Sequence, residues 1–343
     1  MMTYAHEKQI AIGAVVQAAH LCLLVQQEMA VLEALEKGDR SPVTVADFGS
    51  QALICQQLSA AFPCDSIVAE EDAAQLREPG KAAQLTQVVD YVRRFQAAAT
   101  VEQVCAWIDL GRGPVAGRFW TVDPIDGTKG FLRRQQYAIA LALIERGQVQ
   151  VAALGCPALP LAMEEAVSGM GTLFVGVRGQ GAAMAVLDHG DLLPIRVTQA
   201  GDASRLRLVE SVEEAHGNAV LQEAVARAVG IQQPALRLDS QAKYGVLARG
   251  EAALYLRLPS PEHPGYREKI WDHAAGALIV EEAGGQVTDM HGQALDLATA
   301  KTMRANRGVI ASSGGLHEAV LRVLAQRVDA DDPAGGRTGE QSR

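Results

Sequence analysis

The sequence predicts a folded α/β (α+β) protein. Three observations lead to this prediction: a long helical pattern at the N-terminus, two adjacent strand patterns near the middle, and an alternation of strands and helices in the last third. At 343 residues the chain can form one large domain or two, with a substantial core. Its contents of 48% hydrophobic and 21% charged residues are ordinary for folded soluble proteins.

Charge and composition disfavour several classes of partner. A net charge of −9 disfavours a nucleic-acid backbone, and an aromatic content of 4% disfavours a stacking platform for single strands. A small phosphorylated substrate stays compatible, because bound cations would reverse the local field. The longest apolar runs carry charges or glycines and fall short of the ~20 residues that cross a bilayer. We expect no nucleic-acid or membrane partner, and a monomer or weak dimer.

The cysteines and the N-terminus indicate the compartment. The five cysteines are scattered, odd in number and without C-x-x-C spacing, which indicates reduced thiols and no zinc site. Three of them lie in apolar helical patterns and are expected in the core. His6, Glu7 and Lys8 lead directly into a helical pattern, so no signal peptide is expected. We therefore expect a cytoplasmic protein.

The first half of the chain is predicted to begin with helices and end with paired strands. His6–Lys37 is rich in helix-forming residues, and Thr44 is suited to cap a second helix over residues 45–61. The elements expected next are a strand at Ser66–Ala69, two helical pieces within Lys81–Trp107, a loop at Gly111–Gly117, the end of a strand at Phe119–Val122, and antiparallel strands at Tyr137–Ile144 and Val149–Leu154.

The second half is predicted to alternate strands and helices. Strands are expected at Thr172–Val177, Ala182–Val186, Arg205–Glu210, Ala235–Leu238, Ala253–Leu258 and Gly308–Ala311. Helices are expected at Asn218–Val229, Ala242–Arg249, Leu316–Val328, and from Asp272, as its cap, to the glycines at 284 and 285. We expect an N-terminal α+β domain at residues 1–155, a C-terminal α/β domain at 156–328 and a disordered tail at 329–343.

Two carboxylates lie on a tight turn after the predicted central strand. Phe119–Val122 is typical of a buried strand, and Pro124 should end its pairing because proline donates no hydrogen bond. Asp123 and Asp126 carry the hard oxygen ligands that Mg²⁺ prefers. Gly127 permits a backbone geometry that a Cβ would resist, and free amides at the start of a helical turn here would suit a phosphate oxygen. Asp-Pro and Asp-Gly are also ordinary turn formers, so this turn alone decides nothing.

Further acidic residues lie at the ends of other predicted elements. Asp47 lies in the first turn of the second helix, Glu70, Glu71 and Asp72 follow a strand, and Asp272 begins a helix. Each has an ordinary explanation as well, either as complement to a helix dipole or as a solvated surface run. Groups at element ends can converge from distant parts of a chain. Five acids in one cleft would repel unless cations held them, and carboxylate sites with bound Mg²⁺ are common in phosphate ester hydrolysis.

The sequence resembles the inositol monophosphatase-like, lithium-sensitive phosphatases. The two signatures of that family match Asp123-Pro-Ile-Asp-Gly-Thr128 and Trp271-Asp-His-Ala-Ala-Gly276. Four segments resemble one branch, the 3′(2′),5′-bisphosphate nucleotidases: Ser41-Pro-Val-Thr44 with Asp47, Gly130-Phe-Leu-Arg133, Leu238-Asp-Ser-Gln-Ala-Lys-Tyr244 and Tyr255-Leu-Arg-Leu-Pro259. The resemblance covers residues 8 to 326. It implies a layered αβαβα sandwich of the inositol monophosphatase / fructose-1,6-bisphosphatase type.

The resemblance also implies a role for each matching residue. Two or three Mg²⁺ ions would be bound by Glu70, Asp123, Asp126, Asp272 and the carbonyl of Ile125. Asp47 and Thr128 would orient and deprotonate the attacking water. The substrate would be bound by Gly127, Thr128, His216, Ser240, Lys243 and Arg257. Without the resemblance, the favoured explanation of Lys243 and Arg257 is that they are solvated or ion-paired, and that of His216 is a surface histidine.

The implied activity is Mg²⁺-dependent removal of the 3′-phosphate from adenosine 3′,5′-bisphosphate and from its sulfated relative, with lithium as an inhibitor. The products would be an AMP-type nucleotide and phosphate. One alternative is a phosphatase of inositol (poly)phosphates or a sugar bisphosphate, which would have no need of Ser240, Lys243 and Arg257 if its substrate carried a single phosphate. The other is a non-catalytic nucleotide sensor, in which loss of a ligand or of the water-activating pair would be expected.

Overall fold

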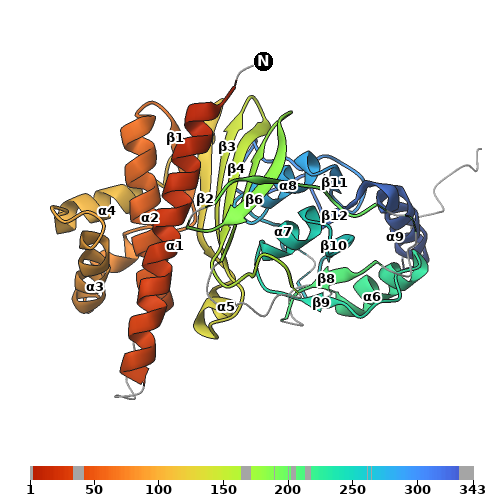
Figure 1. The fold of residues 1–343 in the computed structure, drawn as a ribbon, viewed down its shortest axis with the longest axis horizontal. Helices are drawn as coiled ribbons and strands as arrows, with labels where there is room; N and C mark the ends of the chain where they lie inside the picture. The colour runs from red at the N-terminus through yellow and green to blue at the C-terminus, as the bar shows by residue number, and fades with distance from the viewer. Residues whose placement is uncertain are drawn as a thin grey trace, which may run out of the picture.

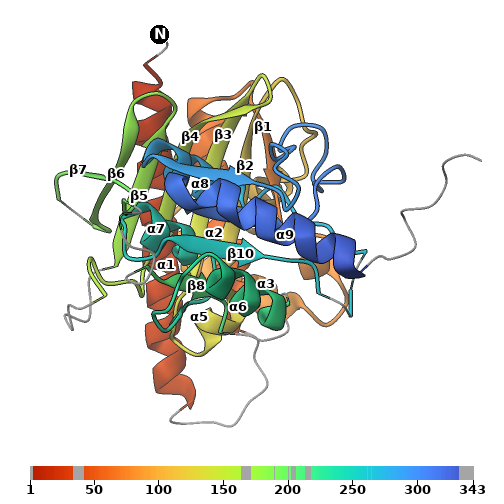
Figure 2. The ribbon, with the colours of Figure 1, turned by 90° about the vertical axis from the view of Figure 1, so that its right-hand side faces the viewer.

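The computed structural model describes residues 3–33, 42–163, 171–188, 190–199, 201, 206–212, 218–260, 262–263 and 265–331. Within these residues, a seven-stranded and a five-stranded sheet alternate with helical layers. Figures 1 and 2 show α1 and α2 on the outer face of the larger sheet, α7 and α8 between the two sheets, and α6 and α9 on the far side of the smaller sheet. The arrangement is a layered αβαβα sandwich.

The larger sheet carries its strands in sequence order. They are β1 (Ser66–Ala69), β2 (Arg118–Asp126), β3 (Ala138–Glu145), β4 (Gln148–Cys156), β5 (Thr172–Val177), β6 (Gly181–Val186) and β7 (Leu193–Ile195). β1 pairs with β2 in parallel, and the remaining pairs are antiparallel. The first six match predicted strands, whereas β7 has only three residues and was not predicted. The sheet runs across residue 155, and the domain boundary placed there stays a prediction.

The smaller sheet has the order β11-β12-β10-β8-β9. Its strands are β8 (Leu208–Glu210), β9 (Leu236–Arg237), β10 (Leu254–Arg257), β11 (Gly285–Thr288) and β12 (Val309–Ser313). β8 pairs in parallel with β9 and β10, and β12 pairs antiparallel with β10 and β11. β11 was not predicted, because it begins directly at the glycine that was expected to end the preceding helix. The first residue of the predicted strand at Arg205–Glu210 lies outside the described residues.

The helices match the predicted pattern more closely inside than at their ends. They are α1 (Ala5–Glu33), α2 (Pro42–Ala61), α3 (Ala82–Arg93), α4 (Val101–Asp109), α5 (Thr128–Leu132), α6 (Ala219–Ala228), α7 (Ala242–Ala248), α8 (Ala274–Glu282) and α9 (His317–Asp331), with short 3₁₀ turns at Gln75–Arg77 and Gly314–Leu316. The predicted end of the first helix, residues 34–37, lies outside the described residues.

Three predicted helix ends are wrong. α2 begins at Pro42, so Thr44 lies inside the helix and Asp47 in its second turn; proline favours the first helical position because its missing N–H is not needed there. α8 begins at Ala274 after His273, so Asp272 precedes the helix and does not cap it. α9 continues to Asp331, which makes residues 329–331 helical; the rest of the predicted tail, 332–343, lies outside the described residues.

Helix α1 differs from the expectation about membrane spans. Among the described residues, its stretch Ala5–Glu28 is long and apolar enough by length and composition to cross a membrane. Of the most apolar window in this stretch, 44% is buried inside the protein. Ala14, Val15 and Ala18 are fully buried in the core beside the larger sheet. A core helix with these contacts has the same composition as a spanning one.

The layer between the two sheets depends on close packing of α7 and α8. All residues of α7 are buried, as are Ala274–Val280 of α8. Gly276 faces the ring of Tyr244 so closely that a Cβ would lie 2.3 Å from its Cδ2 atom. The small residues of this segment therefore set the distance between the two helices, and α7 and α8 carry several of the site residues described below.

Gly276→Ala is expected to destabilise the protein. Alanine gains roughly 1 kcal/mol of helix propensity over glycine, but the new methyl group must displace a buried tyrosine, at a cost of about 1–3 kcal/mol. Denaturant unfolding should show a net loss of stability. Gly117→Ala is the control, because a Cβ there has nothing within 4 Å. Equal stability of both variants and the parent would contradict the tight contact between α7 and α8.

Candidate active site

The acidic turn is built on an irregularity in β2. Asp123 pairs with Ala140 of β3, and Asp126 pairs with Ala138, so two residues on β2 oppose one on β3 between these pairs. Pro124 lies in this bulge and does not end the strand as predicted, since its missing N–H costs no ladder bond where the ladder is interrupted. Ser50 of α2 donates a hydrogen bond to the Pro124 carbonyl at 3.1 Å. The bulge re-aims the two aspartates toward one side of the sheet end.

Gly127 turns the chain from β2 into α5. Its φ of 87° lies in the left-handed region, and the short helix α5 begins at Thr128. A Cβ on Gly127 would lie 2.9 Å from the Cβ of Ser240. The glycine therefore allows the start of α7 to approach the acidic turn. Thr128 donates its hydroxyl to the carbonyl of Ile125 at 3.4 Å.

One cavity of about 290 Å³ brings most of the predicted site residues together. The predicted residues that line it are Glu70, Asp123, Ile125, Asp126, Gly127, Thr128, Ser240, Lys243, Arg257 and Asp272. Asp47 does not line the cavity but lies buried beside it, where its charge acts on Asp123. His216 lies outside the described residues. Six segments far apart in the sequence thus converge on one site.

The carboxylates of this cavity perturb one another strongly. Burial, together with the charges of Glu70 and Asp126, raises the pKa of Asp123 well above its usual range. Glu70 is open to the cavity, yet partial burial and the charges of Glu71 and Asp126 raise its pKa to about 7. Burial also raises the pKa of Asp272 to about 7, against the opposing effect of His273. The cation-free site therefore favours bound protons.

Neighbouring charges affect the pKa values of Asp126 and Asp47 in opposite directions. Burial raises the pKa of Asp126, but the positive charges of Lys243 and Arg257 lower it. Burial raises the pKa of Asp47 well above its usual range, and the charges of Glu71 and Glu70 raise it further. Negative neighbours thus add to the effect of burial at Asp47, whereas positive neighbours oppose it at Asp126.

The donor set of the acidic side fits hard divalent cations. It consists of carboxylate oxygens and the carbonyl of Ile125, which are the ligands that Mg²⁺ prefers. Among the described residues, the buried Oδ1 atom of Asp123 has no hydrogen-bond partner. An unpaired buried carboxylate oxygen is costly unless a cation or a proton satisfies it. The chemistry of this wall therefore matches a multi-cation site.

Two basic residues, Lys243 and Arg257, line the cavity, and neither side chain is fully exposed to solvent. Lys243 is 3% exposed, and burial lowers its pKa to about 8 although Asp126 opposes this. Its Nζ atom donates to the carbonyl of Leu238 at 3.3 Å. Arg257 pairs through Nε with Glu268 at 2.8 Å. The solvated alternative is wrong for Lys243, and Arg257 is ion-paired as well as lining the cavity.

Gln241 is a site residue that the sequence analysis did not single out. Its backbone N–H donates to Oδ2 of Asp126 at 2.5 Å. Its side chain donates to the carbonyl of Trp271 at 2.9 Å and accepts from the amide of Gly276 at 3.2 Å. It therefore ties the acidic turn to the segment that carries Asp272. Its place in the matching segment Leu238–Tyr244 was the only available signal.

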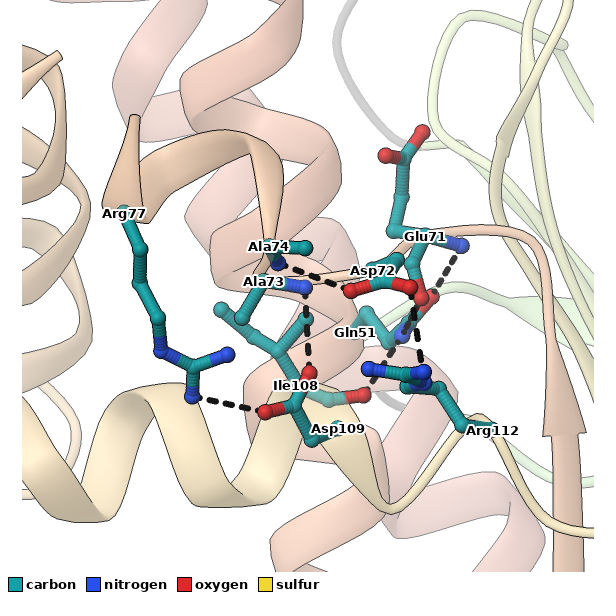
Figure 3. Close-up of polar contacts among 9 residues, drawn as sticks. All are labelled: Gln51, Glu71, Asp72, Ala73, Ala74, Arg77, Ile108, Asp109 and Arg112. Atoms are coloured by element: carbon teal, nitrogen blue, oxygen red, sulfur yellow. Dashed lines mark hydrogen bonds and ion pairs between the residues drawn. The ribbon is translucent and has the colours of Figure 1, made fainter. Parts of the chain in front are cut away.

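Figure 3 shows how the acidic segment after β1 is held. Gln51 of α2 donates to the carbonyl of Glu71 at 2.8 Å and accepts from its amide at 2.9 Å. The same side chain donates to the carbonyl of Ile108 at 2.9 Å. Asp72 accepts from the amide of Ala74 and pairs with Arg112 at 3.4 Å. The three consecutive acids are thus not a plain surface run, since Glu70 lines the cavity and its neighbours are fixed.

Comparisons with known proteins identify the family. The model of the inositol monophosphatase family matches residues 3–329. The chain belongs to the inositol monophosphatase family. Within this family it is similar to proteins named 3′(2′),5′-bisphosphate nucleotidase: 41% identical to that of Schizosaccharomyces pombe (97% of this chain, 98% of the relative), and 42% identical to that of Emericella nidulans (94% and 98%).

Solved structures of the family confirm the predicted fold class. The inositol monophosphatase of Anabaena (Nostoc) superposes with a TM-score of 0.63 at 21% identity, covering 95% of this chain and 97% of the other. CysQ of Bacteroides thetaiotaomicron superposes with a TM-score of 0.57 at 18% identity, covering 91% and 98%. The layered sandwich of α1 to α9 is therefore the fold of this family.

Proposed function

We propose that this chain is an Mg²⁺-dependent phosphatase that removes the 3′-phosphate of adenosine 3′,5′-bisphosphate and of its sulfated relative. The observation that carries the proposal is a single cavity lined by the carboxylates of Glu70, Asp123, Asp126 and Asp272 together with the basic side chains of Lys243 and Arg257. The relatives named 3′(2′),5′-bisphosphate nucleotidase support the choice of substrate. A cytoplasmic monomer or weak dimer stays part of this proposal.

Two or three Mg²⁺ ions would be held by Glu70, Asp123, Asp126, Asp272 and the carbonyl of Ile125. When bound, such ions neutralise the repelling carboxylates and make a water molecule acidic enough to attack a phosphate ester near neutral pH. The bulge at Pro124 and the hydrogen bond from Gln241 hold Asp123 and Asp126 in place for this task.

Other residues would activate the attacking water and bind the substrate. Asp47 accepts the proton of the attacking water, for which its raised pKa suits it, and Thr128 orients that water. Lys243 and Arg257 bind the phosphate that does not react, and arginine can do so with two parallel hydrogen bonds. Gly127, Ser240 and His216 complete the substrate contacts, as the resemblance implies.

Asp47→Asn is expected to lower kcat by about 10²–10⁴-fold, because asparagine keeps the shape of the side chain but cannot accept the proton. Cation affinity, measured by calorimetry, should stay close to that of the parent, since Asp47 lies beside the cavity. Thr128→Val should lower kcat with little change in stability. Unchanged hydrolysis by Asp47→Asn would remove Asp47 from its role as proton acceptor.

The substrate assignment is tested by comparing kcat/KM for adenosine 3′,5′-bisphosphate with that for inositol 1-phosphate in Mg²⁺. We expect a clear preference for the nucleotide. A preference for the inositol ester would favour the alternative of an inositol phosphatase. Binding of the nucleotide without turnover of either compound would instead favour a nucleotide sensor.

A further inference from the structure

A buried chain of hydrogen bonds runs behind the basic side of the cavity. Oε2 of Glu268 lies 2.8 Å from Nε of Arg257 and 3.2 Å from Nε2 of His273. Nδ1 of His273 lies 2.7 Å from the hydroxyl of Tyr244. In a neutral His273, the tyrosine hydroxyl donates to Nδ1 and the Nε2–H donates to Glu268, so every link has a donor and an acceptor. Glu268, His273 and Tyr244 are all buried.

Glu268 is the residue of this hydrogen-bond network that contacts both Arg257 and His273. Burial alone would raise its pKa, but the hydrogen bond from His273 and the charge of Arg257 lower it to about 2. The ion pair with Glu268 restricts the rotation of the Arg257 guanidinium, and Arg257 lines the cavity.

An arginine held in this way is better prepared to bind a phosphate. A free arginine side chain loses rotamer freedom when a ligand fixes it, whereas a side chain already fixed by an ion pair has less freedom to lose. A buried ion pair by itself adds little to stability, because removing both charges from water costs about as much as their attraction returns. The position of this ion pair beside the cavity therefore indicates that it contributes to phosphate binding more than to the stability of the fold.

The same chain reaches the acidic side of the cavity through the backbone. His273 directly follows Asp272, and Tyr244 directly follows Lys243. His273 also directly precedes α8, which begins at Ala274. Arg257 and Asp272 are thus connected through the same set of buried residues.

We propose that Glu268 is a positioning residue for specificity: it holds Arg257 in the orientation that binds the phosphate which is not hydrolysed, and His273 in turn holds Glu268. The inference rests on the proposed function and deepens it, because it assigns the preference for substrates with two phosphates to a residue outside the cavity lining. A substrate that carries only the reacting phosphate gains nothing from the positioning of Arg257.

The test compares adenosine 3′,5′-bisphosphate with adenosine 3′-monophosphate in the parent enzyme and in Glu268→Gln. Glutamine keeps the size of the side chain but not its charge. We expect KM for the bisphosphate to rise roughly tenfold with kcat within about threefold, and KM for the monophosphate to change less than about twofold. The Kd of adenosine 5′-monophosphate, measured by calorimetry, should rise by a similar factor of roughly ten, which is a readout independent of turnover.

Three further variants separate positioning from stability. Glu251→Gln disrupts a partly buried arginine–glutamate pair outside the cavity, in which Glu251 lies 2.6 Å from Arg249, and it should leave the ratio of the two KM values unchanged. In an Arg257→Ala background, Glu268→Gln should have no further effect on this ratio. If Glu268→Gln does not fold, Glu268→Asp keeps the charge but draws it away from Nε, and should raise KM for the bisphosphate selectively.

The outcomes distinguish this inference from the function on which it rests. A parent enzyme that prefers the bisphosphate, with a Glu268→Gln variant whose KM ratio and Kd are unchanged, overturns the positioning role and leaves the function intact. Equal loss with both substrates also overturns it, because that result marks a structural role. A parent enzyme without preference for the bisphosphate overturns both proposals.

Discussion

Replacing Asp123 by asparagine is expected to abolish turnover and, at the same time, to stabilise the cation-free protein. Asp123 is 2% exposed, and its Oδ1 atom has no hydrogen-bond partner among the described residues. Loss of a carboxylate that would hold a catalytic cation removes several kcal/mol of transition-state stabilisation, so kcat/KM should fall by about 10³-fold or more. Loss of the same charge relieves the repulsion by Glu70 and Asp126.

Activity and thermal unfolding in EDTA measure the two effects separately. We expect the melting temperature of Asp123→Asn in EDTA at pH 8 to exceed that of the parent by a few degrees, and added Mg²⁺ to raise it less than it raises the parent. Glu145→Gln is the matched control, because Glu145 lies on β3 at the end remote from Asp126 and accepts a hydrogen bond from Tyr4. It should keep activity. A lower melting temperature of Asp123→Asn in EDTA would contradict the account of mutual repulsion.

The stability of the cation-free protein is expected to fall as the pH rises from about 5 to 8. The pKa values of Glu70 and Asp272 are about 7 in the folded state, against ordinary values near 4 in the unfolded chain. A group whose folded pKa is raised contributes stability that is fully present below the unfolded pKa and lost as the pH rises through the folded one. Asp123, whose pKa is raised by burial and by the charges of Glu70 and Asp126, acts in the same direction.

Divalent cations should remove most of this dependence, because they take the place of the bound protons. The measurement is the melting temperature at pH 5, 6, 7 and 8, each in EDTA and in Mg²⁺. The gain from Mg²⁺ should grow with pH. The range ends at pH 8 because the lowered pKa of Lys243, about 8, adds stability with rising pH above that point. A gain that is the same at every pH would show that the carboxylates are not the cation ligands.

Much of the candidate site could be predicted because its residues lie in short contiguous motifs. Asp123, Asp126 and Gly127 lie in one short stretch of the chain, so a single motif identifies all three. Glu70 and Asp272 were placed at element ends, and both line the cavity. The resemblance, more than periodicity, united these segments, since no pattern within one segment reports on another.

The predictions that were wrong or incomplete missed contacts with residues that are distant in the sequence. Pro124 was expected to end β2, but the strand continues because β3 pairs on both sides of the bulge. Asp272 was expected to cap α8, yet the helix begins two residues later, where His273 is held by Glu268 and Tyr244. Gln241 has three partners that are distant in sequence, so its role was not visible before the fold was known.

The central claim is that acids far apart in the sequence form one cage for divalent cations beside a phosphate-binding wall. Anomalous diffraction from crystals grown with Mn²⁺ and adenosine 5′-monophosphate tests this claim most directly. The account predicts anomalous peaks among Glu70, Asp123, Asp126 and Asp272, with the nucleotide phosphate at Lys243 and Arg257. Peaks only elsewhere, or a nucleotide bound away from these two residues, would contradict it.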